Sequence, residues 1–486
     1  MKKRGRGVPL PVYTATPHST VTTNPRPPQP LVRKAALFSF VFVMYSYTTG
    51  GPFGLEEQVS SSGPGMTLLY HLLIPFFWCI PISLVAAELT TAMPVQGGFY
   101  RWVRAAFGDF WGFLAGWWNW TASFLLGSVY AVLFADYLGF YFPQLTGRNH
   151  YFVAAALIAV VTYINVRGIQ MVGRISSLLE IFVLLPIAVM VVMGLAHWKH
   201  NPFVPLIPPH KPLFQVFGVG LALGVWLYSG YEQLSTVAEE VDNPRRTFPR
   251  ALALVVPLSI ATYFLPTFAS LAALDNWQQW HGDYFSVAAK LIGGPLLGAW
   301  VALAAMIANA ALLNSTVLAT TRMPFALAED GFFPHAFTRI HPRYGTPALA
   351  IVVSAVIYAA FAMFTLTQLI SVYAWLRVAT SVMTVLSAWK LRKLKPEMPR
   401  PFIIPGGKKG LLYAVAAPLL LGIIATAGSV ADTLQRLNCD YTLYDCDYTR
   451  SDSLLVLLSA PAAILLGPLA YIFSQWWRRR GPATPL

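Results

Sequence analysis

A glycine- and proline-rich interruption lies inside the first apolar stretch of the chain, at Thr49-Gly50-Gly51-Pro52-Phe53-Gly54-Leu55-Glu56-Glu57. Three glycines and a proline among residues 49–54 break the hydrogen-bond ladder of a helix. In hydrocarbon, each freed N–H or C=O group costs several kcal/mol unless protein or a ligand satisfies it. We therefore expect this interruption to line a cavity inside the protein rather than to face lipid.

Apolar stretches dominate the rest of the sequence. Of 486 residues, 56% are hydrophobic and only 11% are charged, whereas a soluble protein carries about 25% charged residues. Because about twenty apolar residues cross a bilayer, the sequence predicts an all-α integral membrane protein with twelve transmembrane helices. The expected spans are 34–60, 66–92, 110–142, 150–168, 173–197, 213–240, 250–274, 294–326, 347–366, 368–392, 411–434 and 453–476.

The distribution of basic residues predicts the orientation. The net charge is +14, but the basic residues lie in short loops between apolar spans, which excludes the single basic face of a nucleic-acid-binding domain. The span edges are soft by a few residues. If both termini are cytoplasmic, the inner segments hold 27 of the 34 Lys and Arg residues, and only Arg377 lies well inside a span. This bias predicts a multi-pass protein of the plasma (inner) membrane with cytoplasmic N- and C-termini. Residues 1–33 are expected to form a disordered basic cytoplasmic tail.

The sixth span repeats the anomaly of the first, because Trp226-Leu227-Tyr228-Ser229-Gly230-Tyr231-Glu232-Gln233 interrupts it. Each broken span opens a set of five. Broken helices at matching places in two halves indicate a transporter site built on an inverted repeat. We therefore expect a first repeat at 34–197, a second repeat at 213–392, helices 11 and 12 at 411–476, and a cytoplasmic tail at 477–486.

Three further motifs follow the second, sixth and eighth spans on the predicted cytoplasmic side. They are Ala87-Glu88-Leu89 with Pro94, Gly97-Gly98 and Tyr100; Glu239-Glu240-Val241-Asp242-Asn243-Pro244-Arg245-Arg246 with Pro249; and Arg322 to Pro347, including Ala328-Glu329-Asp330-Gly331. Together and in this order, they resemble the amino acid–polyamine–organocation transporters. The resemblance covers nearly all of the chain after the N-terminal tail.

This resemblance implies the LeuT-like fold, a five-plus-five inverted repeat with broken helices 1 and 6. It also implies that residues 49–53 and 228–231 supply unwound backbone around the substrate, with Tyr231 as an aromatic lid. Gly50-Gly51-Pro52-Phe53-Gly54 and the acidic pair after it look most like the polyamine-uptake branch. The stretch Pro396 to Phe402 also resembles that branch.

Acidic residues stand close to both interruptions. A carboxylate at the bilayer centre costs about 2.5–3.5 kcal/mol, so each one needs a structural or functional explanation. Glu232 is either a counter-charge for a substrate ammonium group or a cap for the N–H groups of its own helix. Glu56 is expected to face the cavity, and Glu57 the outer vestibule or solvent.

A substrate carboxylate would meet like charge at these acids, whereas a cation would meet opposite charge. We therefore predict a secondary active transporter that moves a polyamine or other organic cation by alternating access, with proton coupling. A neutral or cationic amino-acid permease or exchanger is the alternative. An intramembrane enzyme is more remote, because the sequence has no HExxH or GxSxG motif. The predicted substrate-binding residues are Thr49, Gly50, Gly51, Pro52, Phe53, Glu56, Tyr228, Ser229, Gly230, Tyr231 and Glu232.

Two acids outside the interruptions are candidates for coupling, Glu180 and Glu88. Some members of the family that this sequence resembles carry a lysine in helix 5 that takes the place of a coupling ion. This sequence has no Lys or Arg between Arg174 and Lys199 and departs from that pattern. Glu180 can carry a proton there, or it can be a structural residue near the inner surface. By resemblance, Glu88 is structural or part of a gate.

No cofactor, metal site, nucleic acid or obligatory partner subunit is predicted, and the expected partners are a small-molecule substrate, membrane lipid and protons. Two questions stay open at this point. Asp136 and Arg377 are lone charges of opposite sign that either pair or lie apart. Cys439 and Cys446 share one polar loop and form a disulfide or remain free thiols.

Overall fold

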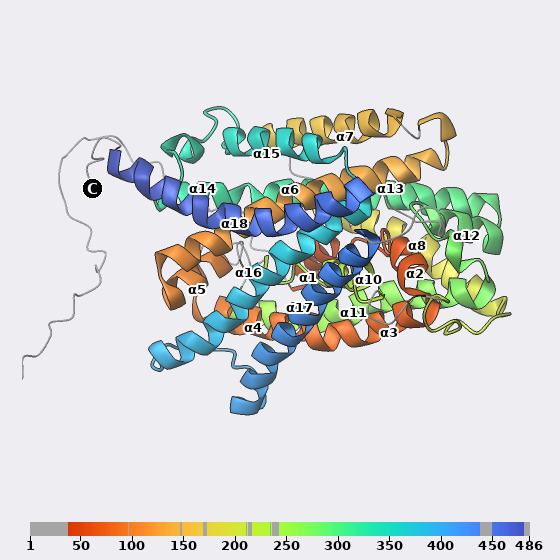
Figure 1. Ribbon diagram of the computed structural model, residues 1–486, viewed down its shortest axis with the longest axis horizontal. Helices are drawn as coiled ribbons and strands as arrows, with labels where there is room; N and C mark the ends of the chain where they lie inside the picture. The colour runs from red at the N-terminus through yellow and green to blue at the C-terminus, as the bar shows by residue number, and fades with distance from the viewer. Residues whose placement is uncertain are drawn as a thin grey trace, which may run out of the picture. The chain divides into compact units, whose positions relative to one another are not determined.

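The computed structural model (Figure 1) describes residues 37–95, 97–145, 148–168, 173–209, 211, 216–233, 235, 243–437 and 450–480. The tail 1–33, the acidic motif 239–242 and both cysteines of the polar loop lie outside the described residues. The α-helices are α1 (Leu37–Thr48), α2 (Glu56–Ser62), α3 (Pro64–Ile74), α4 (Ile80–Ala92), α5 (Gly98–Phe107), α6 (Asp109–Gly139), α7 (Arg148–Val166), α8 (Gly173–Ala196), α10 (Val219–Leu227), α11 (Pro244–Ala273), α12 (Tyr284–Gly293), α13 (Pro295–Thr320), α14 (Arg322–Glu329), α15 (Ala348–Phe361), α16 (Leu366–Leu394), α17 (Gly407–Leu437) and α18 (Arg450–Arg480). A π-helical turn, η1 (Pro75–Cys79), joins α3 to α4, and short 3-10 turns lie at η2 (Pro143–Leu145), η4 (Trp277–Gln279) and η5 (His335–Thr338).

Nine helical segments in the described part of the chain are long and apolar enough to cross a membrane. They correspond to nine of the predicted spans, so the multi-pass, all-helical prediction is confirmed. The three other predicted spans coincide with α1 and α2, with α10, and with α15, which has 14 residues. Each of these helices is shorter than the usual transmembrane length. The twelve-helix arrangement and the inverted repeat stay predictions.

The central helices can be recognised from how deeply they are buried. In the most apolar part of α6, 72% of the residues are buried, and the value for α16 is 67%. The corresponding values are 22% for α7 and 17% for α18. A helix that is apolar all round and buried belongs to the core, whereas a helix with exposed apolar residues faces lipid. The helix α6 packs against both α13 and α16, and these three helices form one side of the core.

The first interruption has the expected cause. The helix α1 ends at Thr48, and α2 begins only at Glu56. Gly50 and Gly54 have φ values of +60° and +92°, a region that residues with a Cβ atom rarely adopt. The close neighbours also require glycine, because a Cβ atom on Gly50 would lie 2.6 Å from Leu312 Cδ1. The prediction that this span is broken is confirmed.

The second interruption follows α10, which ends at Leu227. Gly230 has a φ of +108°, and the chain from Tyr228 to Gln233 turns instead of continuing as an α-helix. Two hydroxyl hydrogen bonds join this segment to neighbouring helices. Tyr263 on α11 donates to the Leu227 carbonyl at 3.1 Å, and Tyr228 donates to the His71 carbonyl of α3 at 3.2 Å. The predicted break is confirmed, while most of the second half of this span lies outside the described residues.

Candidate functional site

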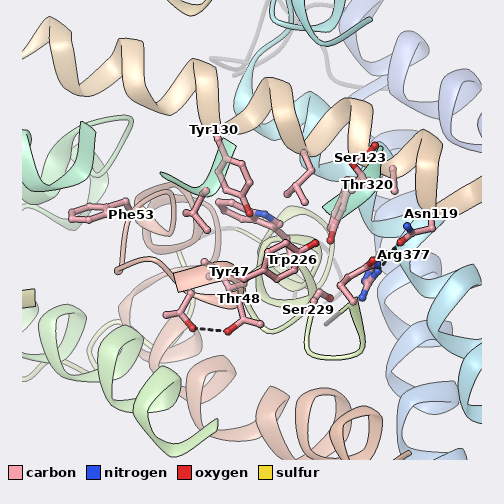
Figure 2. A pocket seen from close by; sticks show the side chains of 18 of the residues that line it. Tyr47, Thr48, Phe53, Asn119, Ser123, Tyr130, Trp226, Ser229, Thr320 and Arg377 are labelled. Atoms are coloured by element: carbon pink, nitrogen blue, oxygen red, sulfur yellow. Dashed lines mark hydrogen bonds between the residues drawn. The ribbon is translucent and has the colours of Figure 1, made fainter. Parts of the chain in front are cut away.

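A cavity lies between the two interruptions, and Figure 2 shows it from close by. Both interruptions contribute to its wall, together with side chains from α6, α11, α13 and α16. The lining residues are Tyr47, Thr48, Thr49, Phe53, Asn119, Ala122, Ser123, Leu126, Tyr130, Trp226, Leu227, Ser229, Gly230, Gln233, Tyr263, Leu312, Thr320, Tyr373 and Arg377. Apolar and aromatic walls with a few polar groups are typical of a small-molecule site.

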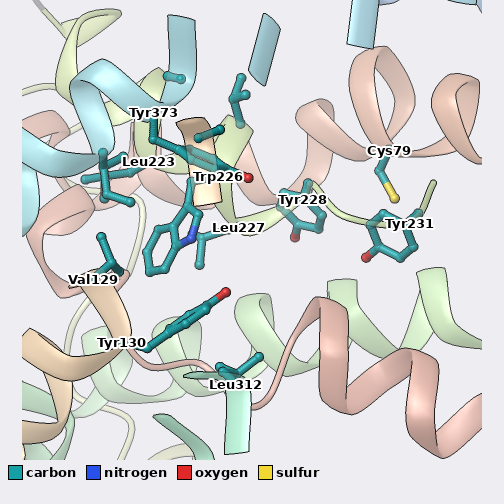
Figure 3. Packing of buried hydrophobic residues seen from close by; sticks show 14 of the residues in the cluster. Cys79, Val129, Tyr130, Leu223, Trp226, Leu227, Tyr228, Tyr231, Leu312 and Tyr373 are labelled. Atoms are coloured by element: carbon teal, nitrogen blue, oxygen red, sulfur yellow. The ribbon is translucent and has the colours of Figure 1, made fainter. Parts of the chain in front are cut away.

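Four of the predicted substrate-binding residues line this cavity: Thr49, Phe53, Ser229 and Gly230. The other seven, which are buried but do not line it, are Gly50, Gly51, Pro52, Glu56, Tyr228, Tyr231 and Glu232. Figure 3 shows the Tyr231 ring beside Cys79, which is fully buried. Because Tyr231 does not line the cavity, its role as a lid stays a prediction.

Aromatic rings from α6 and α10 form one wall. Tyr130 and Trp226 both line the cavity, and their ring centroids are 6.5 Å apart. Figure 3 shows the two rings close together beneath Tyr373. Such rings can hold an ammonium group through cation–π contact. Sequence reasoning missed Tyr130 and did not single out Trp226, because an aromatic residue in an apolar helix is usually a packing residue.

Hydroxyl groups of the first interruption form a small network at another wall. Thr49 Oγ1 lies 2.6 Å from Ser259 Oγ on α11, and 3.4 Å from Thr48 Oγ1 (Figure 2). Ser259 Oγ also donates to the Val255 carbonyl at 3.0 Å. The unwound end of α1 is therefore held against α11 by side-chain hydroxyls that also border the cavity.

The acid of the second interruption does not stand alone. Arg377 on α16 donates from Nη2 to Glu232 Oε1, and the two side chains are only 3% and 1% exposed. Ser381 Oγ also donates to Glu232 Oε1, at 3.4 Å. The charge of Glu232 is thus compensated within the protein by Arg377, a partner that could not be identified from the sequence. Arg377 itself lines the cavity, beside Asn119 (Figure 2).

The acid of the first interruption is not one of the residues that line the cavity. Glu56 is fully buried, accepts a hydrogen bond from the Tyr137 hydroxyl, and accepts another from the Gly54 N–H at 2.7 Å. Its position at the first turn of α2 suits an anion. The expectation that Glu56 faces the cavity finds no support in these contacts. Glu57 is partly exposed and lies 3.1 Å from His281, in keeping with the predicted outer position.

The open question about Asp136 and Arg377 is answered by their separate partners. Asp136 Oδ1 lies 2.7 Å from His150 Nε2 on α7, whereas Arg377 pairs with Glu232. The two lone charges therefore do not pair with each other.

Glu180 on α8 is 7% exposed, and its Oε1 atom has no hydrogen-bond partner among the described residues. The carboxyl group interacts with Ser46, in the last turn of α1. The preceding residue, Tyr45, is hydrogen-bonded to Thr262 on α11 at 2.8 Å. A titratable group therefore contacts the helix that leads directly into the first interruption.

Glu88 lies at the end of α4 and is fully buried. Arg392 Nε donates to Oε1 at 2.8 Å, Arg392 Nη2 donates to Oε2 at 2.5 Å, and the Ile404 N–H donates to Oε2 at 2.9 Å. Arg400 lies 3.6 Å from the same carboxylate. This carboxylate joins α4 to the end of α16 and to the loop that follows, which supports the structural interpretation of Glu88.

Two of the sequence motifs meet at Asp330. Tyr100 donates its hydroxyl to this carboxylate, and Arg101 and Arg104 of the same helix α5 each lie 2.9 Å from Oδ1. Arg478 of α18 donates to the Asp330 carbonyl at 2.6 Å. The motif residues Tyr100, in α5, and Asp330, at the end of α14, thus form a contact between segments that are far apart in the sequence.

Among the described residues, no group of three or more His, Cys, Asp and Glu side chains is arranged to hold a metal ion. His71 is buried and packs between the rings of Tyr228 and Tyr263, at centroid distances of 6.1 and 5.9 Å. These contacts are those of a packed core residue.

An all-helical, multi-pass membrane protein with a partly polar cavity between two interrupted helices has the features of a membrane transporter. The chain belongs to the amino acid permease family, whose model matches residues 35–436. The family and the names of the relatives indicate a transporter and not an enzyme.

The curated relatives include several plant transporters. A probable polyamine transporter of Arabidopsis thaliana is 32% identical over 84% of this chain and 82% of its own length. A polyamine transporter of Oryza sativa subsp. japonica is 30% identical over 81% of this chain and 74% of its own length. An uncharacterized transporter of Legionella pneumophila is 28% identical over 74% of this chain and 83% of its own length.

Proposed function

We propose that this protein is a secondary active transporter that carries a polyamine or a similar organic cation across the plasma membrane by alternating access. The observation that carries the proposal is the cavity between the two interruptions, with the buried carboxylate of Glu232 at its edge and the rings of Tyr130 and Trp226 in its wall. A carboxylate and aromatic faces are the groups that recognise an alkylammonium ion. The names of the plant relatives support the same class of substrate.

Proton coupling through Glu180 is the second part of the proposal. The buried carboxyl group contacts Ser46 at the end of α1, so a change in its charge acts on the segment that enters the first interruption. Loss of the proton places an anion in a buried site, which favours a different packing of α1 against α8. Coupling by population shift needs such a difference in free energy between the two conformations.

The proposed orientation has both termini in the cytoplasm. Arg101, Arg104, Arg392 and Arg478 lie in α5 or near the ends of α16 and α18, and all four belong to the predicted inner segments. The ion pairs around Glu88 and Asp330 would then hold the cytoplasmic end of the helices together. Arginine residues on that side of the membrane are favoured by the positive-inside rule.

A second candidate is a permease for neutral or cationic amino acids. The specific observation in its favour is Arg377, whose guanidinium in the cavity wall can donate hydrogen bonds to a substrate carboxylate. In this case, Glu232 would serve only to hold Arg377 in place.

The experiment that separates the two candidates is counterflow into proteoliposomes containing the full-length protein. Vesicles are preloaded with spermidine, putrescine, arginine or leucine, and accumulation of the same labelled compound is measured. Accumulation with the polyamines and not with leucine supports the proposal. Accumulation with the amino acids alone contradicts it and supports the amino-acid permease.

A further inference from the structure

The ion pair between Glu232 and Arg377 stands at the edge of the cavity that is proposed to receive a cation. Glu232 comes from the second interruption and Arg377 from α16, so the pair links the two elements across the site. Both side chains are almost completely buried. Breaking such a pair by removing one partner is costly, because it leaves an uncompensated buried charge. Any change in the carrier that separates these groups must therefore supply another partner for Glu232.

The hydrogen bonding of the pair is incomplete. Among the described residues, Glu232 Oε2 and Arg377 Nε have no hydrogen-bond partner. The contact from Arg377 Nη1 to Asn119 Oδ1 is long, at 3.4 Å, and the same oxygen already accepts a bond from Gln233 Nε2. A purely structural buried pair is expected to satisfy its remaining donors and acceptors. Here the carboxylate keeps one oxygen available for an additional donor.

Arg377 also has other acceptors within reach of the same space. It lines the cavity together with Asn119, Tyr47 and Tyr373. Figure 2 shows its guanidinium beside the Asn119 carboxamide. If another cation takes Glu232, the guanidinium can turn toward these oxygen atoms and remain in the polar part of the site.

We propose that Arg377 is a tethered substitute for the substrate cation: it neutralises Glu232 in the empty carrier, and an ammonium group of the substrate displaces it. This inference rests on the proposed function, because it requires a cationic substrate. Both the empty and the loaded carrier then keep Glu232 neutralised, so both can change conformation. Without Arg377, the empty carrier holds a bare buried carboxylate and cannot return, while the loaded carrier still can.

The test uses Arg377→Gln in the full-length protein, reconstituted in proteoliposomes. Net uptake of labelled spermidine into empty vesicles is expected to fall about ten-fold or more, because it requires return of the empty carrier. Counterflow into spermidine-loaded vesicles is expected to stay within about three-fold of wild type. The Kd for spermidine is expected to decrease about ten-fold, because the internal competitor is gone. Arg377→Lys keeps a cation and is expected to retain net uptake.

Retention of net uptake by Arg377→Gln, or equal loss of counterflow and of spermidine binding in a folded variant, would overturn the inference. The second result is also the one expected if Arg377 binds a substrate carboxylate. If Arg377→Gln does not fold, the double variant Glu232→Gln/Arg377→Gln leaves no charge unpaired. It is expected to bind spermidine about ten-fold more weakly than wild type, and unchanged binding would equally overturn the inference.

Measurements on the wild-type protein distinguish failure of the proposed function from failure of this inference alone. If wild type neither binds nor transports a polyamine, the proposed function fails, and this inference fails with it. If wild type transports spermidine and Arg377→Gln keeps full net uptake, the proposed function stands and only the inference fails.

Discussion

Gly54 in the first interruption is in direct contact with Trp226 at the end of α10. A Cβ atom on Gly54 would lie only 2.6 Å from Trp226 Cη2 and 2.9 Å from Leu133 Cδ1. The two interruptions therefore pack against each other at a position that only glycine fits, because glycine has no Cβ atom. This contact brings the indole of Trp226 into the wall of the cavity.

Gly54→Ala is accordingly expected to reduce both stability and transport. Backbone strain at a φ of +92° costs about 1 kcal/mol or more, and steric overlap adds about 1–3 kcal/mol. The matched control is Gly294→Ala, because Gly294 has a φ of +89° and nothing within 4 Å of the added atom. Thermal melting of the two detergent-solubilised variants measures the difference. Equal melting temperatures would show that contact with Trp226 does not matter.

Glu88→Gln is expected to weaken the junction between α4 and α16. The carboxylate receives charged hydrogen bonds from Arg392 and lies near Arg400, and the amide can accept only part of these. Hydrogen bonds to charged groups contribute about 1.5–3 kcal/mol each, so we expect a clearly lower melting temperature. Glu397→Gln is the control, because Glu397 is exposed in the loop after α16. If the Glu88 variant has the same melting temperature as this control, the structural role of Glu88 is excluded.

Tyr130 tests whether the aromatic wall recognises a cation. Tyr130→Leu is expected to raise the Kd for spermidine about 2- to 30-fold, the equivalent of a cation–π contact of ~0.5–2 kcal/mol. Tyr130→Phe keeps the ring and should bind nearly as wild type does. Titration of the purified proteins with spermidine gives both values. If the phenylalanine and leucine variants lose affinity equally, the hydroxyl group and not the ring is the recognising element.

Glu180→Gln tests the proposed coupling. The amide keeps the shape of the side chain but cannot release a proton. Uptake driven by an imposed pH gradient is expected to fall about ten-fold or more, while counterflow at equal pH stays within about two-fold of wild type. The exposed-site variant Glu397→Gln should retain both activities. Gradient-driven uptake that persists after substitution of Glu180 would exclude this acid as the proton carrier.

The backbone of the site was predictable from the sequence because glycine and proline act locally. Gly50, Gly54 and Gly230 have positive φ values, and both interruptions begin close to the expected residues. Most of the cavity wall was not predictable. Asn119 and Ser123 on α6 face the cavity, but a polar residue in an apolar helix does not reveal which neighbour it faces.

The charges were the hardest part to predict because their partners lie far away in the sequence. Glu232 and Arg377 are 145 positions apart, and nothing in the sequence near either residue indicates the other. The prediction that Glu56 faces the cavity, and the two alternatives for Glu232, considered only the helix ends beside these acids. That local reasoning does not identify the hydrogen bond from Tyr137 to Glu56 or the ion pair between Arg377 and Glu232.

The most direct test of the central claim is equilibrium binding of labelled spermidine to the purified protein and to Ser123→Trp. Ser123 lines the cavity on α6, so the indole occupies the space proposed for the substrate. Val192→Trp is the control, because Val192 on α8 is 69% exposed and is not one of the residues that line the cavity. Our account predicts saturable binding by wild type and by the control, and its loss in a folded Ser123→Trp protein. Unchanged binding by Ser123→Trp, or no binding by wild type, would contradict it.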